Sequence, residues 1–230
     1  MYVDLNKLKN ILGLIVPSDT SIGIHGIGGE CTNELFDNLF KNGIKNNSWG
    51  GVLSNFEMKG TYEEMDDYDW QKVWQYCYHV DNNGNTATVI AGIPSFLKDS
   101  EGNKYFIGKF PKNNTNFYAK GKEELGASLP INQYVDLTRL FPSEFIVGIL
   151  FTDTNKNENY FFVNKNYIGY KGLNERNKFF EQIKEKLLNC GAIDVKNIDK
   201  YIEQYQRFNP GSEDDLFIRQ LKEIIKGKSK

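Results

Sequence analysis

An apolar strand that breaks into a glycine-rich turn is the feature that most constrains the fold of this chain. Residues 21–29 read Ser-Ile-Gly-Ile-His-Gly-Ile-Gly-Gly, and His25 is one of two histidines in the sequence. Glycine removes the side chain where backbone approaches another group closely or takes a positive φ. Turns of this kind occur in nucleotide and acyl-transfer sites, but the same pattern also forms ordinary tight turns. The segment therefore predicts a strand and a turn, with a ligand site and a purely structural turn as alternatives.

Helical patterns flank this strand on both sides. Residues 3–14 carry apolar side chains at helical spacing, and Pro17 ends that pattern. After the strand, Thr32 is a candidate N-cap for a helix that runs to about Lys41 and that Gly43 closes. The chain is therefore predicted to open as helix, strand, glycine turn and helix.

Several later segments have the composition of β-strands. Residues 86–93 are rich in β-branched side chains and stop at Pro94, and residues 104–108 are apolar and aromatic. Residues 145–151 form another apolar run, which we expect to pair with residues 159–163 as a hairpin. The acidic stretch over residues 57–69, in contrast, predicts a solvated loop or helix surface.

From residue 174 onward the apolar side chains recur at helical spacing. Ser212 is a candidate N-cap for the last helix of this region. The chain is thus predicted to start with a helix, to continue with strands and few helices, and to end with helices alone. This order favours an α+β fold over a doubly wound sheet. We expect an α+β domain over residues 1–171 and a helical extension over residues 172–230 that packs on it.

Composition excludes several classes of protein. Hydrophobic residues make up 40% of the chain, charged residues 25%, and the net charge is -2, which favours a soluble folded protein over a general nucleic-acid binder. The three cysteines and two histidines lack the spacing of a disulfide framework or a metal site. The apolar run at residues 11–16 is too short to cross a bilayer, and no signal-like region opens the chain. We therefore expect a cytoplasmic protein with no metal and no membrane partner.

A few polar side chains are candidate site residues. His25 can hydrogen-bond a ribose hydroxyl or a carboxamide, or be satisfied by backbone groups. Glu144 comes directly before an apolar strand, where a carboxylate can orient a hydroxyl or stabilise positive charge, although Pro-Ser-Glu is also an ordinary surface turn. Ser54 can bind a ligand or cap a turn. His79 lies in an aromatic segment and is predicted to be structural.

Taken in order, four of these segments resemble the ADP-ribosyltransferase superfamily. They are the His25-Gly26 strand end, the helix that ends before Ile44, the Gly51-Val52-Leu53-Ser54 segment and the Pro142-Ser143-Glu144-Phe145-Ile146 strand start. The resemblance is to the histidine-containing branch, which includes poly-ADP-ribose polymerases and many small bacterial relatives, and it covers residues 20–152. It implies a split, mainly antiparallel β-sandwich with flanking helices.

The resemblance also implies an activity and a set of roles. His25 would contact the adenosine-side ribose of NAD, the backbone of Gly26 would hold the nicotinamide amide, Ser54 would flank the nicotinamide, and Glu144 would orient the nicotinamide ribose and the acceptor. The chain would then cleave NAD at the nicotinamide glycosidic bond and transfer ADP-ribose to an acceptor, a protein among the candidates, or to water as an NAD glycohydrolase. It departs from the polymerase pattern in having Ser54 where a tyrosine is usual. It departs from the toxin pattern in having Pro142 where a Glu or Gln is usual.

Two other interpretations compete with this one. The sequence His-Gly-x-Gly-Gly is also similar to the oxyanion loop of α/β-hydrolases, but the chain has no Gly-x-Ser-x-Gly nucleophile elbow and no late histidine for a triad. A non-catalytic interaction protein on an α+β scaffold is the second alternative. It predicts no NAD binding and no effect of Glu144→Gln.

Overall fold

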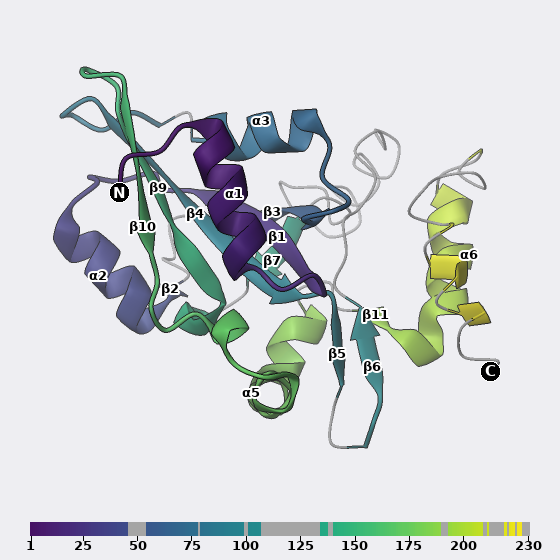
Figure 1. Ribbon diagram of the computed structural model, residues 1–230. Helices are drawn as coiled ribbons and strands as arrows, with labels where there is room; N and C mark the ends of the chain where they lie inside the picture. Colours follow the sequence, from purple (N-terminus) through teal and green to yellow (C-terminus); the bar gives the residue numbers. More distant parts are fainter. Residues whose placement is uncertain are drawn as a thin grey trace.

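An antiparallel sheet forms the centre of the molecule in the computed structural model (Figure 1). Within the described part of the chain this sheet has six strands in the order β10-β9-β4-β1-β3-β7, and every neighbouring pair is antiparallel. The fold is therefore α+β, as predicted. The structure describes residues 1–45, 54–77, 79–98, 101–106, 134–137, 140–189, 193–208, 211, 219, 221–223 and 225–226.

The elements follow the chain in an order close to the expected one. The strands of the central sheet are β1 (Thr20–Gly26), β3 (Ser54–Thr61), β4 (Asn85–Pro94), β7 (Tyr134–Leu137), β9 (Ile146–Asp153) and β10 (Glu158–Val163). Shorter strands form a sheet of β5 (Phe96–Lys98), β6 (Lys104–Phe106) and β11 (Ile193–Asp194), and a pair of β2 (Ile44–Lys45) and β8 (Leu140–Phe141). The helices are α1 (Leu5–Ile15), α2 (Asn33–Asn42), α3 (Asp67–Gln75), α5 (Leu173–Asn189) and α6 (Ile198–Phe208), and the 3-10 turns are η1 (Ser143–Phe145), η2 (Ile168–Tyr170) and η3 (Val195–Asn197).

The two helices around β1 form where the sequence predicts them. Asp4 caps α1 by accepting a hydrogen bond from the backbone N–H of Lys7 at 2.7 Å, and Leu8 and Leu12 bury the apolar side of this helix completely. Figure 1 shows α1 lying across one face of the central sheet. The predicted N-cap of α2, Thr32, accepts from the N–H of Leu35 at 3.1 Å. Both N-caps thus satisfy backbone donors that the first turn of a helix leaves unpaired.

Gly43 ends α2 because both its backbone conformation and its surroundings exclude a side chain. Its φ is +74°, a conformation that side chains rarely adopt. A Cβ at this position would collide with the carbonyl oxygen of Phe141, in the segment that leads to η1. The end of α2 is therefore fitted against the start of β9.

The ladders fix which side chains share a face. His25 lies opposite Val89 of β4, Val89 lies opposite Ile149 of β9, and Ile149 lies opposite Phe162 of β10. Directly opposed residues of antiparallel strands point to the same face. Phe162 contacts Phe36 of α2 with ring centroids 5.5 Å apart, so His25 lies on the face of the sheet that α2 covers at the β10 end.

The edge of the sheet at β10 is covered by the first residues of the chain. Tyr2 forms a β-bridge with Tyr160, and the Val3 N–H donates to the carbonyl of Asn159 at 2.9 Å. The Phe161 N–H donates in turn to the carbonyl of Met1 at 2.8 Å. These bonds pair polar groups that an edge strand would otherwise leave open to another chain.

The acidic stretch over residues 57–69 is only in part the predicted solvated loop or helix surface. Residues 62–66 form a turn and a loop, and the exposed Asp67 and Tyr68 begin α3, but the first part of the stretch belongs to β3, between β1 and β7. Lys59 and Asp69 are both buried, with the ammonium nitrogen 4.0 Å from a carboxylate oxygen. A buried pair of opposite charges looks in sequence like part of a solvated charge run, which is why the pattern misled.

The C-terminal region begins with the predicted helices and also contributes a strand. Helices α5 and α6 confirm the helical pattern, and β11 between them pairs with β6. The predicted N-cap Ser212 lies outside the described residues. None of the described helices has the length and apolar character needed to cross a membrane.

Candidate functional site

The sheet brings three of the four predicted site residues to neighbouring positions. His25 and Gly26 are the last residues of β1 and are partly exposed, and Ser54 is the first residue of β3. Strands β1 and β3 are antiparallel, with Ile24 opposite Glu57, so the beginning of β3 lies beside the end of β1. His25, Gly26 and Ser54 therefore share one end of the sheet.

The glycines of the turn after β1 are not required by the fold. None of Gly26, Gly28 and Gly29 has a positive φ. A Cβ on Gly28 or Gly29 would meet no atom within 4 Å, and one on Gly26 would make only ordinary contact with the Cys77 sulfur at 3.5 Å. The turn therefore presents backbone without side chains at Gly28 and Gly29, on a segment that could carry side chains without strain.

A buried carboxylate holds this turn in place. Asp81 is 7% exposed and accepts hydrogen bonds from the backbone N–H groups of Cys31, Asn83 and Asn85 at 3.0, 2.9 and 2.8 Å. Burial opposes ionisation of Asp81, but these N–H bonds, that of Cys31 first, outweigh it and lower the pKa of the carboxyl group. The residue before Cys31, Glu30, accepts from the Asn82 side chain at 2.6 Å. The glycine turn is thus tied at its far end to the turn that precedes β4.

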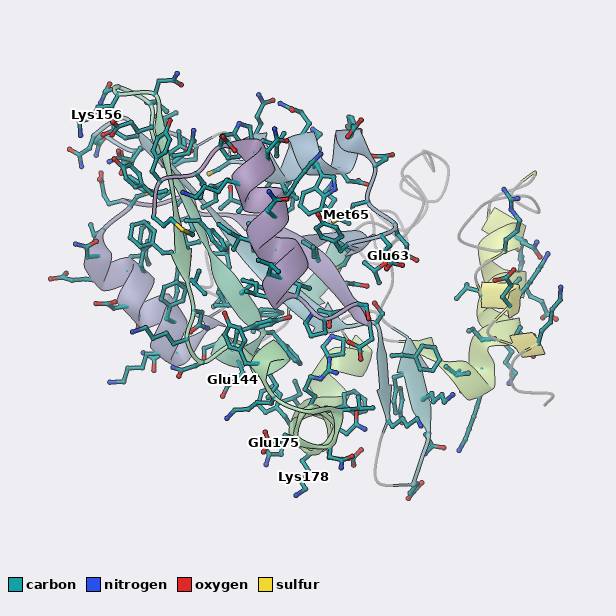
Figure 2. All side chains as sticks on the ribbon, viewed as in Figure 1. Glu63, Met65, Glu144, Lys156, Glu175 and Lys178 are labelled. Atoms are coloured by element: carbon teal, nitrogen blue, oxygen red, sulfur yellow. The ribbon has the colours of Figure 1, made fainter. Side chains whose placement is uncertain are left out.

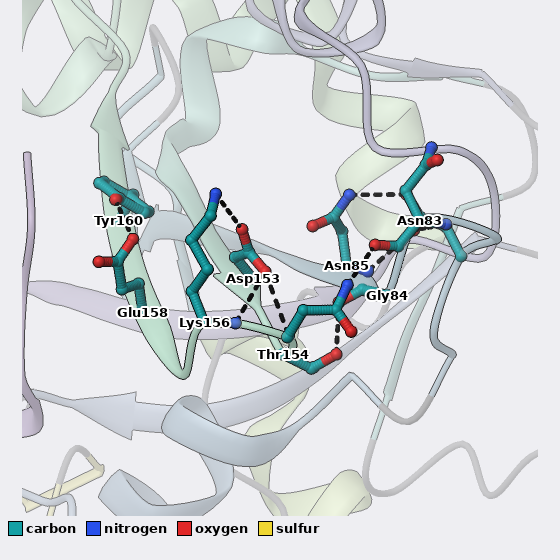
Figure 3. Close-up of polar contacts among 10 residues, drawn as sticks. Asn83, Gly84, Asn85, Asp153, Thr154, Lys156, Glu158 and Tyr160 are labelled. Carbon is teal, nitrogen blue, oxygen red and sulfur yellow. Dashed lines mark hydrogen bonds and ion pairs between the residues drawn. The ribbon is translucent and has the colours of Figure 1, made fainter.

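The hairpin of β9 and β10 supports that second turn (Figure 3). The Asn155 side chain donates to the carbonyl of Asn83 at 2.8 Å, and the Thr154 N–H donates to the carbonyl of Gly84 at 2.9 Å. Gly84 has a φ of +78°, and a Cβ there would collide with the Asn155 side chain. The hairpin tip, the turn before β4 and the glycine turn therefore form one connected polar end of the molecule.

Two cysteines lie against the glycine turn. The Cys31 sulfur is 3.8 Å from the carbonyl oxygen of Gly29, and the Cys77 sulfur is 3.4 Å from that of Ile27. Burial, with the nearby Asp81 charge next in importance, raises the pKa of Cys31 to about 12. Cys31 is therefore a protonated thiol at neutral pH, which is the less nucleophilic form.

Glu144 lies at the other end of β9. It is the middle residue of η1 and is partly exposed, and its carboxylate accepts a hydrogen bond from the hydroxyl of Ser143 at 3.1 Å. Figure 2 shows Glu144 and Lys156 at opposite ends of the β9–β10 hairpin. Since the glycine turn is linked to the Lys156 end of this hairpin, Glu144 and the turn do not lie at the same end of the sheet.

The ladders give the separation between His25 and Glu144. His25 is level with Ile149, whereas Glu144 comes two residues before Ile146, and one strand, β4, lies between β1 and β9. With ~4.8 Å between strands, ~3.3 Å per residue along β9 and ~2 Å per residue in η1, the two Cα atoms are roughly 17 Å apart. His25 and Glu144 therefore do not contact each other, and a ligand that touches both must be extended.

A residue that the sequence did not single out supports Glu144. The side-chain amide of Asn164, which is 1% exposed, donates to the carbonyls of Ser143 and Ile146 at 2.9 Å each. These carbonyls lie on either side of Glu144. Asparagine just after a strand is common in turns, so its type and position alone gave no signal of this contact.

Within the described part of the chain, no group of three or more His, Cys, Asp or Glu side chains is arranged to hold a metal ion. The Cys77 thiol lies 3.6 Å from the backbone carbonyl of His79, and a structural role for the imidazole of His79 stays a prediction.

Comparison of this chain with protein-family models, with curated proteins and with solved structures finds no match in any of the three.

Proposed function

We propose that this chain is an ADP-ribosyltransferase-like enzyme that breaks the bond between nicotinamide and ribose in NAD and passes ADP-ribose to an acceptor nucleophile. The observation that carries the proposal is the open glycine turn beside His25. Its glycines answer no need of the fold, whereas backbone without side chains at Gly28 and Gly29 suits close approach by a ligand. Ser54, the first residue of β3, lies on the neighbouring strand beside the end of β1.

The distance between the turn and Glu144 suits a dinucleotide. His25, Gly26 and Ser54 would bind the adenosine part of NAD, and Glu144 would lie beside the glycosidic bond at the other part, so the nicotinamide contacts that the resemblance implies for Gly26 and Ser54 do not belong to this proposal. An extended dinucleotide can bridge a separation of roughly 17 Å between strands of one sheet. A single sugar or a free base is too short to reach both groups.

The proposed reaction depends mainly on a carboxylate held beside the glycosidic bond of NAD. When the glycosidic bond breaks, its electron pair leaves with nicotinamide and the ribose carbon becomes oxocarbenium-like. The negative charge of Glu144 would stabilise this centre and orient a ribose hydroxyl. The acceptor then forms a bond to the same carbon and loses a proton to solvent. Holding the acceptor and the dinucleotide together supplies the remaining advantage.

The test is release of nicotinamide from NAD, with NAD binding followed by ligand-observed NMR. Wild type is expected to bind NAD and release nicotinamide, whereas Glu144→Gln binds NAD but loses turnover. Glu175→Gln is a matched control, because Glu175 is an exposed glutamate in the first turn of α5. Binding of NAD without release by wild type would overturn the catalytic part of the proposal. Absence of both would favour the non-catalytic interaction protein instead.

A further inference from the structure

We propose that Ser143 and Asn164 are positioning residues that hold Glu144 in its reactive orientation. This inference rests on the proposed function, and it assigns roles to two residues to which the resemblance gives none. Glu144 lies in a single 3-10 turn, between Pro142 and the first residue of β9. One turn of 3-10 helix has little stability of its own. Its geometry must therefore be set by what surrounds it.

Asn164 fixes the backbone of that turn. Its amide group uses one N–H on the carbonyl of Ser143 and the other on the carbonyl of Ile146, both at 2.9 Å. Its side-chain oxygen accepts from the backbone N–H of Asn166 at 3.1 Å. The backbone N–H of Asn164 donates to the carbonyl of Val147 at 2.9 Å. The side chain of Asn164 is thus fully hydrogen-bonded, and the residue is 1% exposed. Asn164 therefore acts as a clamp, in the sense that its side-chain amide fixes the peptide groups on both sides of Glu144.

Ser143 carries the restraint from the backbone to the carboxylate. It is 8% exposed, its carbonyl is one of the two that Asn164 holds, and its hydroxyl donates to Oε2 of Glu144 at 3.1 Å. A hydrogen bond to an ionised group is stronger than one between neutral groups. Asn164, Ser143 and Glu144 therefore form a chain of contacts from a buried amide to a partly exposed carboxylate.

A carboxylate held in this way should matter to the rate more than to binding. If Glu144 turns away from the ribose, NAD can still bind through His25 and the glycine turn, but the positive charge that develops in the reaction meets no fixed partner. Misplacement of a reacting group by about 1 Å can cost on the order of a hundredfold in rate. Loss of the clamp is therefore expected to lower kcat and to leave KM nearly unchanged.

The experiment compares kcat and KM for NAD in Ser143→Ala, Asn164→Ala and the conservative Ser143→Thr, which keeps the hydroxyl. We expect kcat to fall roughly tenfold in Ser143→Ala and by up to about a hundredfold in Asn164→Ala, with KM within about twofold of wild type. Ser143→Thr should retain most of the wild-type kcat. If Asn164→Ala does not fold, the two Ser143 variants still decide the matter.

Thr152→Val is the matched control. The hydroxyl of Thr152 donates to the side-chain oxygen of Asn159 at 2.7 Å, within the same β9–β10 hairpin but away from Glu144. It should lower the unfolding midpoint about as much as Ser143→Ala and leave kcat unchanged. If Glu144→Gln is inactive but Ser143→Ala and Asn164→Ala turn over NAD like wild type, the inference is wrong and the proposed function stands. If wild type does not release nicotinamide, the proposed function fails and the inference fails with it.

Discussion

Lys59 of β3 and Asp69 of α3 form an ion pair inside the molecule, with Nζ and Oδ1 4.0 Å apart and both side chains closed to solvent. The pair joins the strand beside β1 to the helix that follows it. Asp69 also takes part in the capping box of α3, since it accepts from the N–H of Asp66 at 3.3 Å. One carboxylate thus serves both the start of a helix and the attachment of that helix to the sheet.

Replacement of Lys59 by methionine should strongly destabilise the protein. The change leaves the Asp69 carboxylate buried without its cation, which costs about 3–5 kcal/mol when one partner of a buried pair is removed. Thermal unfolding of Lys59→Met measures this loss, and Lys59→Met with Asp69→Asn should recover part of it. Lys9→Met is the control, because its partner Asp67 is exposed and the midpoint should change little. A Lys59→Met variant as stable as wild type would contradict this account.

Alanine substitution should separate a glycine that the fold needs from one that it does not. Gly43→Ala forces a side chain into a φ of +74° and against the carbonyl of Phe141, so we expect a loss of at least about 1 kcal/mol. Gly28→Ala meets open space without positive φ and should leave the free energy of unfolding unchanged or slightly raised. Urea unfolding measures both values. If Gly28→Ala had a lower free energy of unfolding than Gly43→Ala, the glycine turn would be strained.

The same Gly28→Ala variant tests the turn as a binding surface. If NAD approaches this backbone closely, a methyl group there should weaken NAD binding several-fold while the protein remains as stable as wild type. Ligand-observed NMR gives the affinity, and Gly172→Ala serves as control, since a Cβ on Gly172 also meets open space at a position remote in sequence. Equal NAD affinity in the two variants would remove the turn from the proposed site.

Acidification should weaken the anchor of the glycine turn through Asp81. The pKa of this carboxyl is lower in the folded protein than the ordinary value near 4, so its contribution to stability is present above that value. The contribution is lost as the pH falls through the folded-state pKa. Urea midpoints measured from pH 7 down to pH 2.5 should therefore decline more steeply for wild type than for Asp81→Asn. Parallel curves for the two proteins would show that the fold does not lower the pKa of Asp81.

The Cys31 thiol should react slowly with alkylating reagents. With a pKa of about 12 against an ordinary value of 9.0, its thiolate fraction at pH 8 is lower by roughly a thousandfold. Iodoacetamide labelling of a Cys77→Ser, Cys190→Ser variant, read by mass spectrometry, isolates this residue. Labelling should be slow in the native protein and fast in urea. Fast labelling without urea would mean that the turn opens readily.

The parts of the fold that were predicted correctly depend on neighbours in sequence. Helices α1 and α2 follow from apolar periodicity with Asp4 or Thr32 at the N-cap, and the β9–β10 hairpin follows from two apolar runs around a short turn. Strand β3 was missed because its charge pattern indicated a surface. Only contact with α3 makes Lys59 a buried residue, and no local pattern records that contact.

The residues of the candidate site could also be predicted only in part from the sequence. His25 and Gly26 could be singled out because a strand and a glycine turn are local features. Asn164 could not, because its contacts lie 18 and 21 residues away in sequence, across a hairpin whose register only the folded sheet defines. The separation of His25 from Glu144 also depends on strand order, which places β4 between their two strands.

The bridge between Tyr2 and Tyr160 has a consequence for the order of folding. The Met1 amino group and the carbonyl of Phe161, which meet at 3.4 Å, are 160 residues apart in sequence. Closing so long a loop carries a large entropic cost, so this contact is expected to form late and to open first. During refolding, β10 is then complete while its outer edge is still bare. Intermolecular association through that edge is therefore favoured at high protein concentration, and dilute refolding should give the better yield.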